Sequence, residues 1–502
     1  MTRITNKTVL LLLLVVSAAC NVSKDIEKPS AVLPKTFRNA APENKASVAD
    51  IQWKHFFTDA PLQNLIEKAI VKNYDMQLAV KNIEASQLLL KQTKWAYLPD
   101  ARLQVTSSLN RPSDNSLNGL SAKQYLKTPH VEDYSANVTL SWEADIWGKI
   151  KNQKAAALAG YLQTEEARKA IQTNIVAAVA QGFYNLLMLD EQLKIAQRNI
   201  VLNDSTLRII RLQFAAGQVT ALAIQQAEAQ QLTASALVPQ LEQNIAIQEN
   251  ALSILAGDLP DRIQRNVSLQ QVHLADNLSA GVPAEMVSRR PDVKSYELAL
   301  DIANAQVGIA KANMYPSLSI TAGGGLNSFR ASNWFNVPAS LFGIVAGGVA
   351  QPLFQKKQLR TAYEVAKVER EKSVIQFRQS VLHAVGEVSD ALVRIDKLQT
   401  AQKISLQRVN TLQRAISNAN MLFQTGMANY LEVITAQSNV LEGELELAAV
   451  TREQLSAKVE LYRSLGGGWK AEPAIGMAGE YKSDLAQQGE ERKKVNNNIF
   501  LK

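Results

Sequence analysis

The chain has 502 residues, a formal net charge of +8, a single cysteine and a hydrophobic content of 46%. One cysteine cannot form an intramolecular disulfide. Basic and acidic residues alternate along the chain without a basic stripe interleaved with aromatic residues, so no nucleic-acid partner is expected.

The first 20 residues have the order of an export signal. Basic residues precede an apolar run over 9–16, and small residues at 17–19 precede Cys20. The run is shorter than the ~20 apolar residues that span a bilayer as a helix, so it predicts a cleaved signal peptide. The polar, proline-containing stretch that follows predicts an extended linker.

The chain is predicted to contain two similar halves, because landmarks recur at a near-constant offset. Phe-Ala-Ala-Gly at 214–217 returns as Phe-Gln-Thr-Gly at 423–426. The predicted organisation is a signal peptide, a linker, a first repeat, a connector, a second repeat and a polar tail. Their respective bounds are 1–19, 20–60, 61–257, 258–282, 283–467 and 468–502.

Each half is predicted to begin with one helix and two strands. The helices run from Pro61 to about Tyr97 and from Pro283 to about Asn313, because proline is tolerated in a first turn and apolar residues follow at helical spacing. Alternating apolar and polar residues then predict strands, the first two joined by a loop over 111–130. The predicted strands span 101–110, 134–142, 317–321 and 341–349. The fourth alternates least clearly.

Each half is predicted to end in a long helical hairpin with a glycine at its tip. Proline is absent from 130 to 238 and from 353 to 472, and glycine is sparse in both windows. The four helices are predicted over 148–214, 219–256, 356–423 and 428–465. The first would be about 100 Å long, which exceeds the width of an ordinary globular domain. The chain is therefore predicted to form a rod or a tube.

Four strands of about ten residues have the length that spans an outer membrane when the strands are tilted. Four strands cannot close a barrel, and an open sheet edge is not tolerated in lipid. The chain is therefore expected to pool its strands with copies of itself, two copies giving eight strands and three giving twelve. A soluble four-stranded sheet would show the same alternation, but it would leave the export signal and the long helices unexplained.

Four ordered motifs resemble those of one family of membrane channels. They are an opening segment from Trp53 to Asn73, the strand-to-helix turn Trp142–Lys149, the helix start Arg289–Val293 and the helix-to-strand turn Tyr315-Pro316. Through them the chain resembles the TolC-like outer-membrane efflux channels, in the lipoprotein branch that serves resistance-nodulation-division pumps. The resemblance covers residues 50 to 470 approximately.

The resemblance implies an α+β membrane protein. Its fold would be a trimeric 12-stranded outer-membrane β-barrel continuous with a 12-helix periplasmic α-barrel, with two internal repeats in each chain. Its function would be the passive exit of drugs or other small toxic compounds from a tripartite pump. The implied partners are two further copies of the chain, a periplasmic adaptor, an inner-membrane pump and outer-membrane lipid.

The resemblance also suggests site residues. Cys20 lies where a bacterial lipobox has its lipidated cysteine, although Ser17 departs from the usual Leu or Val. Adaptor contacts are implied at the hairpin tips, and a periplasmic gate just beyond the second tip. The tip residues are Phe214, Ala215, Gly217, Gln424, Thr425 and Gly426. The gate residues are Leu431, Glu432 and Thr435, where Thr435 stands in place of the family's usual Asp.

No enzyme, cofactor or metal signature is found in the sequence. The four histidines, His55, His130, His273 and His383, have no neighbour at metal-ligand spacing. The run Gly323–Gly325 lacks the Lys-Ser/Thr ending of a phosphate-binding loop. The eight methionines are scattered, so organic cargo is favoured over copper or silver ions.

Two alternatives to this function stay open at this point. The first is a metal-ion efflux channel for copper or silver. The second is a secreted scaffold or adaptor rod without a pore, which would share the helical hairpins but would not need four amphipathic strands.

Overall fold

The computed structural model describes residues 34, 36–38, 47–272, 274 and 279–470. The predicted signal peptide, Cys20 and most of the predicted tail lie outside the described residues. The chain divides into two compact units. The strand unit comprises 78–167 and 292–382, and the hairpin unit comprises the described residues of 33–77, 168–291 and 383–470.

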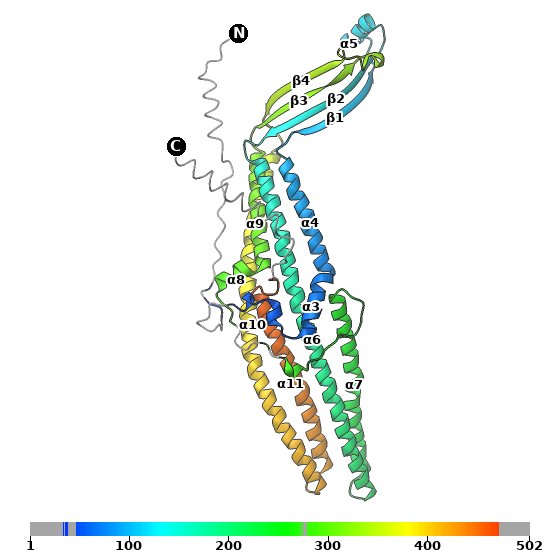
Figure 1. Cartoon of the computed structure of the whole chain (residues 1–502), viewed down its shortest axis with the longest axis vertical. Helices are drawn as coiled ribbons and strands as arrows, with labels where there is room; N and C mark the ends of the chain where they lie inside the picture. Colours follow the sequence, from blue (N-terminus) through cyan, green and yellow to red (C-terminus); the bar gives the residue numbers. More distant parts are fainter. Residues whose placement is uncertain (1–33, 35, 39–46, 273, 275–278, 471–502) are drawn as a thin grey trace. The chain divides into compact units, whose positions relative to one another are not determined.

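Helices and strands follow the same order in the two halves of the chain (Figure 1). The first half contains α3 (Ala60–Lys72), α4 (Tyr74–Trp95), β1 (Asp100–Asn110), β2 (Val131–Ala144), α6 (Lys149–Ala215) and α7 (Ala221–Leu255). The second half contains α8 (Pro283–Arg289), α9 (Pro291–Ala312), β3 (Ser317–Ser328), β4 (Leu341–Ala350), α10 (Gln358–Gln424) and α11 (Tyr430–Ser464). The short elements are η1 (Val48–Asp50), α2 (Trp53–Phe56), α5 (Leu117–Ser121), η2 (Ala122–Leu126), η3 (Leu269–Gln271) and η4 (Ala331–Asn333).

The four strands form one antiparallel sheet in the order β1-β2-β3-β4. All four predicted strands are confirmed, including β4, whose alternation is least clear in the sequence. β1 and β4 each pair with one neighbour among the described residues. Both lateral edges of the sheet therefore present unpaired backbone groups.

The segment between β1 and β2 differs from the predicted loop. It contains α5 and then one π-helical turn, η2. Ser116 begins α5, because its hydroxyl accepts a hydrogen bond from the backbone N–H of Gly119 at 3.1 Å. Lys127 ends η2 in the left-handed conformation, with a φ of 56°.

The helix predicted from Pro61 to Tyr97 is wrong in one respect, since Asn73 divides it into α3 and α4. Asn73 is non-helical (φ −57°, ψ 133°). Its Oδ1 accepts hydrogen bonds from the backbone N–H groups of Asp75 at 2.9 Å and Met76 at 3.2 Å. Asparagine in this arrangement caps a new helix.

The helix predicted from Pro283 to Asn313 is also divided, at Arg290. Arg290 is followed by Pro291, and a proline ring disfavours helical geometry in the preceding residue. The two interruptions are equivalent in the two halves. Asn73 Nδ2 donates to the carbonyl of Leu255 at 2.9 Å, and Arg290 Nη1 donates to the carbonyl of Ser464 at 3.0 Å. Each break is thus tied to the last residue of a returning helix.

Left-handed glycines end α7 and α11 beside these breaks. Gly257 has a φ of 74° and Gly466 a φ of 86°. A Cβ at Gly257 would clash with the backbone of Lys72, and a Cβ at Gly466 would lie 3.0 Å from the carbonyl oxygen of Arg289. Glycine is therefore favoured at both positions by the turn and by the close approach of another helix.

The two hairpins are equal in length. α6 and α10 have 67 residues each, and α7 and α11 have 35 each. A 67-residue helix is about 100 Å long. The predicted bounds are confirmed to within two residues at every end.

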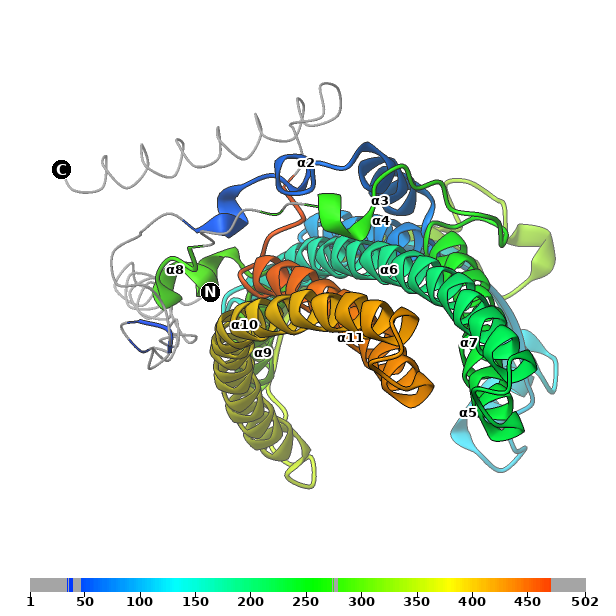
Figure 2. The same cartoon turned by 90° about the horizontal axis from the view of Figure 1, so that it is seen from below.

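In the hairpin unit the long helices lie side by side in the order α10, α11, α6, α7 (Figure 2). Hydrogen-bonded ion pairs link each helix to the next. They join Arg408 to Glu446 (α10–α11), Arg198 to Glu444 (α11–α6, 2.6 Å) and Arg211 to Glu228 (α6–α7, 2.6 Å). Exposed ion pairs of this kind contribute little to the free energy of folding, but each pair identifies two neighbouring helices. α7 also contacts α11, since Ala223, Ala227 and Val433 belong to one apolar cluster.

Part of the predicted linker packs against the end of α11. Phe56 stacks on Tyr462 with ring centroids 4.2 Å apart, and Phe57 is fully buried. The hydroxyl of Tyr462 donates to the carbonyl of Ile51 at 2.7 Å. Burial raises the pKa of Tyr462 because the ionised phenolate would lose its hydration.

Candidate functional site

The sheet has one apolar and one polar face along β1 and β2. The register places Leu103 opposite Val138, and Gln104 opposite Asn137 on the other face. Asn137 Nδ2 donates to the hydroxyl of Ser135 at 3.1 Å, so polar side chains contact one another along the second face. The predicted alternation of β2 is confirmed. Its apolar side chains are partly solvent-accessible, with Val138 47% exposed in the single chain.

Two tryptophans fix the turn between β2 and α6. Trp142 Nε1 donates to the carbonyl of Tyr97 at 2.9 Å, and Trp147 Nε1 donates to the carbonyl of Pro316 at 2.6 Å. The ring of Trp147 also stacks on Tyr315, with centroids 4.8 Å apart. The strand-to-helix turn of the first repeat is thereby bound to the helix-to-strand turn of the second. These are two of the sequence motifs that carry the family resemblance.

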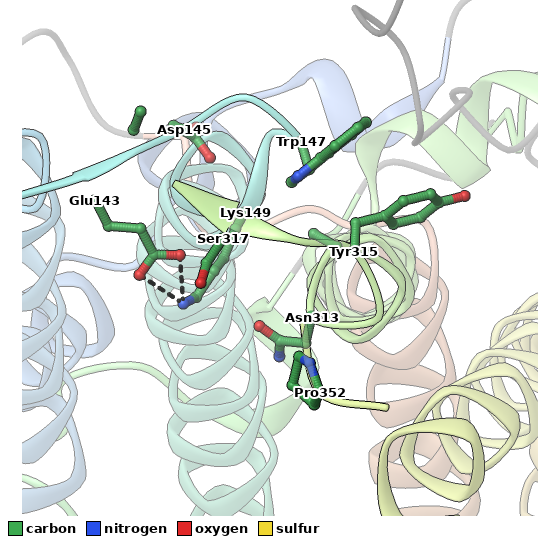
Figure 3. Close-up of a pocket in the computed structure, with 10 residues that line it drawn as sticks. Glu143, Asp145, Trp147, Lys149, Asn313, Tyr315, Ser317 and Pro352 are labelled. Carbon is green, nitrogen blue, oxygen red and sulfur yellow. Dashed lines mark hydrogen bonds and ion pairs between the residues drawn. The ribbon is translucent and has the colours of Figure 1, made fainter. Parts of the chain in front are cut away.

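Charged side chains complete this turn (Figure 3). Lys149 Nζ lies 3.1 Å from both carboxylate oxygens of Glu143. The two carboxylate oxygens of Asp145 accept hydrogen bonds from the backbone N–H groups of Ile150 and Lys151, each at 2.9 Å. A carboxylate at this position accepts hydrogen bonds from N–H groups that have no acceptor within α6. Its negative charge also interacts favourably with the positive end of the helix dipole.

Asp145→Ala is expected to lower the free energy of unfolding by about 1–2 kcal/mol, because two backbone N–H groups at the start of α6 lose their acceptor. Asp145→Asn should retain one acceptor and lose less. The temperature at which the folded protein dissociates on a denaturing gel measures both variants. Glu143→Gln is the matched control, since it changes an exposed ion pair and should shift that temperature least.

The residues predicted at the hairpin tips are all exposed. Gly217 and Gly426 have φ values of 73° and 77°, and a Cβ at either would meet no atom within 4 Å. Backbone conformation alone therefore explains both glycines. The tips differ in one respect: Phe214 is 45% exposed, whereas its counterpart Phe423 is 4% exposed.

Phe423 is buried because an apolar cluster joins the two hairpins just behind their tips. The cluster consists of Leu207, Ile210, Ala223, Ala227, Phe423 and Val433, contributed by α6, α7, α10 and α11. Ile210 and Val433 are fully buried within it. The cluster holds the start of α11 against the other hairpin, so it determines which face of α11 stays open.

The predicted gate residues lie on the exposed side of the start of α11. Leu431 and Thr435 are one turn apart and share a face that points away from buried Val433. Glu432 is rotated about 100° from Leu431 and lies toward the flank of the helix. Its backbone N–H donates to the Asn429 side chain at 3.1 Å, within the first turn, where a carboxylate is stabilised by the helix dipole.

An ion cluster that the sequence analysis missed fixes the connector after α7. The guanidinium of Arg265 bonds to the carboxylates of Asp190 and Glu249, and its Nη1 donates to the carbonyl of Ile263 at 2.8 Å. The hydrogen bond to Asp190 is the main cause that raises the pKa of Arg265. Asp190 and Glu249 are 75 and 16 positions from Arg265 in sequence, so no local pattern predicts this cluster.

A second missed feature is a buried polar layer between α6 and α11. Gln437 Nε2 donates to the hydroxyl of Thr206 at 2.7 Å, and Asn203 Nδ2 donates to Asn199 Oδ1 at 2.9 Å. All four side chains are at most 5% exposed. The Asn203–Asn199 bond lies within α6, whereas the Gln437–Thr206 bond joins α11 to α6 and favours one register between the two hairpins.

The described residues contain no group of three or more His, Cys, Asp or Glu placed to hold a metal ion. None of the described helices combines the length and the apolar character needed to cross a membrane.

The fold and these motifs can be compared with known proteins. The model of the outer membrane efflux protein family matches residues 65–258 and 282–467. The chain is 25% identical to the probable outer membrane lipoprotein SilC of Salmonella typhimurium, over 91% of this chain and 97% of that protein. It is 27% identical to the cation efflux system protein CusC of Escherichia coli K12, over 89% and 96%. It is 28% identical to the toluene efflux pump outer membrane protein TtgF of Pseudomonas putida, over 84% and 86%.

Solved structures give the same result. A membrane protein from Pseudomonas aeruginosa matches with a TM-score of 0.81 and 25% identity, over 89% of this chain and all of that chain. CusC matches with a TM-score of 0.77 and 26% identity, over 89% and 100%. The two stretches matched by the family model coincide with the two structural repeats, and the resemblance seen in the motifs is confirmed. The chain belongs to the outer membrane efflux protein family.

Proposed function

We propose that three copies of this chain form one continuous duct, with a 12-stranded β-barrel in the outer membrane and a 12-helix α-barrel in the periplasm. The open edges of the four-stranded sheet are the main support for this proposal. β1 and β4 would leave unpaired backbone groups in lipid, and four strands are too few to close a barrel. Pairing β4 of one copy with β1 of the next removes every edge. The number three follows from the resemblance to TolC-like channels.

The duct would act as the exit of a tripartite efflux pump. It conducts passively and performs no chemistry, while an inner-membrane pump of the resistance-nodulation-division class supplies the energy. A periplasmic adaptor would contact the exposed hairpin tips around Gly217 and Gly426. We also propose the domain bounds given above, with the repeats over 61–257 and 283–467.

Cargo is the part of the function on which the relatives differ. CusC is named a cation efflux protein and TtgF a toluene efflux protein. We propose organic compounds as the main cargo of this chain, because its described residues provide no metal-ligating cluster. Copper or silver efflux is the second candidate, and it is favoured by the match to CusC, which is named a cation efflux protein.

Cross-linking between the sheet edges tests the proposed assembly. Cys20 is the only natural cysteine, so thiols introduced into a Cys20→Ala chain react without background. Gln104→Cys on β1 and Ile344→Cys on β4 lie on the same sheet face, at opposite edges. A short bismaleimide added to membranes should produce covalent trimers from the double variant.

The two single variants serve as controls for this experiment. Each should give monomers on a denaturing gel, because equivalent positions in neighbouring copies are separated by a full sheet width. Covalent dimers without trimers, or equal products from single and double variants, would contradict the proposed closure.

Cys20 is proposed to be lipidated, and we expect it to anchor the chain without being needed for assembly. The barrel buries far more apolar surface in the membrane than the acyl chains do. Cys20→Ala behind a non-lipoprotein signal should still give trimers in the outer membrane, measured by membrane fractionation and gel migration. Failure to assemble despite normal export would contradict this.

A further inference from the structure

β4 differs from the other three strands in having no polar side chain on either face. Its sequence is Leu-Phe-Gly-Ile-Val-Ala-Gly-Gly-Val-Ala over 341–350. A strand with one face in lipid and one in water alternates apolar with polar residues, as β1 and β2 do. Both faces of β4 carry only apolar residues and glycine. The face of β4 that lies on the polar side of the sheet therefore differs from the polar faces of β1 and β2.

The register identifies that face. Val345 pairs with Ala322, which pairs with Leu140, so Val345 belongs to the apolar face of the sheet. Ile344 pairs with Gly323, which pairs with Thr139, so Ile344 belongs to the polar face. Phe342 lies in the neighbouring row of the polar face, opposite Gly325, which pairs with Asn137. Ala346 lies in the next row toward the other end of the strand.

Glycine on β3 widens this apolar surface. Gly323 and Gly325 carry no side chain between β4 and the polar ladder of β2. A Cβ at Gly325 would clash with the backbone of Ala136, so this position accepts no side chain without rearrangement. Phe342 and Ile344 are 39% and 57% exposed, so nothing within the chain covers them fully. In the rows through Asn137 and Thr139, the polar face thus carries amide and hydroxyl groups on β2, and bare backbone and hydrocarbon on β3 and β4.

We propose that Phe342 and Ile344 determine cargo specificity, by forming an apolar stripe on the lumenal wall that contacts the hydrocarbon part of amphipathic organic compounds. The inference rests on the proposed barrel, in which the polar face lines the lumen and the stripe occurs three times, between polar stripes. A hydrated metal ion gains nothing from such a wall, whereas an organic amphiphile can place its apolar part on β4 and its polar part on β2. The stripe therefore assigns organic amphiphiles, rather than metal ions, to this duct.

The test compares cargo efflux with pore conductance in cells that carry a partner pump and adaptor. Nile red is the organic probe, Cu(I) tolerance is the metal probe, and K⁺ conductance of the purified protein in a planar bilayer counts working pores. Phe342→Asn combined with Ile344→Asn should lower Nile red efflux per conducting pore about fivefold, the expected effect of losing a modest apolar contact. Cu(I) tolerance should not change in parallel. Phe342→Leu with Ile344→Val should retain efflux.

Two further variants make the result decisive. Val349→Thr changes the same strand on the opposite, lipid-facing side and should leave the efflux ratio unaltered. Thr139→Val extends the stripe onto β2 and should raise Nile red efflux, a gain that misfolding cannot imitate. An unchanged ratio in the Asn double variant together with no gain in Thr139→Val would overturn the proposal. Absence of K⁺ conductance even when Leu431→Ser is added would instead contradict the proposed duct.

Discussion

Val138→Arg and Leu140→Arg are each expected to destabilise the membrane-inserted protein by about 2–4 kcal/mol. Both side chains lie on the apolar face of β2, and Val138 is near the middle of a strand that runs from Val131 to Ala144. A guanidinium placed there would lie in the hydrocarbon region of the bilayer without a partner. Stability can be measured from the urea or heat dependence of trimer dissociation after reconstitution.

Asn137→Arg and Thr139→Arg are the matched controls, because they alternate with the first pair along the same strand. They face the proposed lumen, where water solvates the added charge, so they should be tolerated. Equal tolerance at all four positions would contradict the lipid-facing assignment. Equal loss at all four would indicate that both faces of β2 are buried.

Leu431→Ser is expected to raise the basal conductance of the closed channel. In a tube closed at its far end, three copies of the start of α11 approach the axis, and three leucine side chains would exclude water there. Leu431 is 52% exposed in the single chain and shares its face with Thr435, which suits a position facing the axis. Single-channel recording at low voltage measures the effect.

The first hairpin provides a control for this variant. Leu222 is the second residue of α7, as Leu431 is of α11, and it is 55% exposed. Leu222→Ser removes the same amount of apolar surface outside the proposed gate, so basal conductance should stay low. A rise in both variants would point to general loosening of the hairpins rather than to a gate at Leu431.

Glu432→Gln tests the charge of the same region. Three carboxylates around a narrow wet pore would attract cations, so cation selectivity should weaken in this variant. Glu432 lies toward the flank of α11, and the helix dipole also suits a carboxylate in that turn. Unchanged reversal potentials would leave Glu432 as a surface charge in the first turn of α11 and would remove it from the gate.

The strands and long helices could be predicted because each follows a single period over many residues. In β2 the alternation from Tyr134 to Trp142 is complete, and in α6 no proline or cap interrupts the pattern. The break at Asn73 could not be read in the same way. Its Oδ1 caps α4 locally, but its Nδ2 donates to a distant carbonyl, that of Leu255, and that contact forms only in the folded chain. The break at Arg290 did have a local signal, because Pro291 follows it.

The site residues also differ in whether their role has a local signal in the sequence. Gly217 and Gly426 were predictable, because a left-handed turn between two long helices favours glycine by itself. The Arg265 cluster and the layer around Gln437 were not, since their partners come together only when the hairpins pack. Phe342 is an intermediate case: its hydrophobicity is plain in the sequence, but only the strand register places it on the polar face.

Single-channel recording on purified, reconstituted protein tests the central claim most directly. Unheated samples should migrate as a trimer on a gel, heated samples as a monomer, and only the unheated form should produce discrete conductance steps in a planar bilayer. That result is expected of a duct whose barrel is closed by three copies. A folded trimer that gives no conductance, even with Leu431→Ser in the gate, would contradict the account and favour a scaffold without a pore.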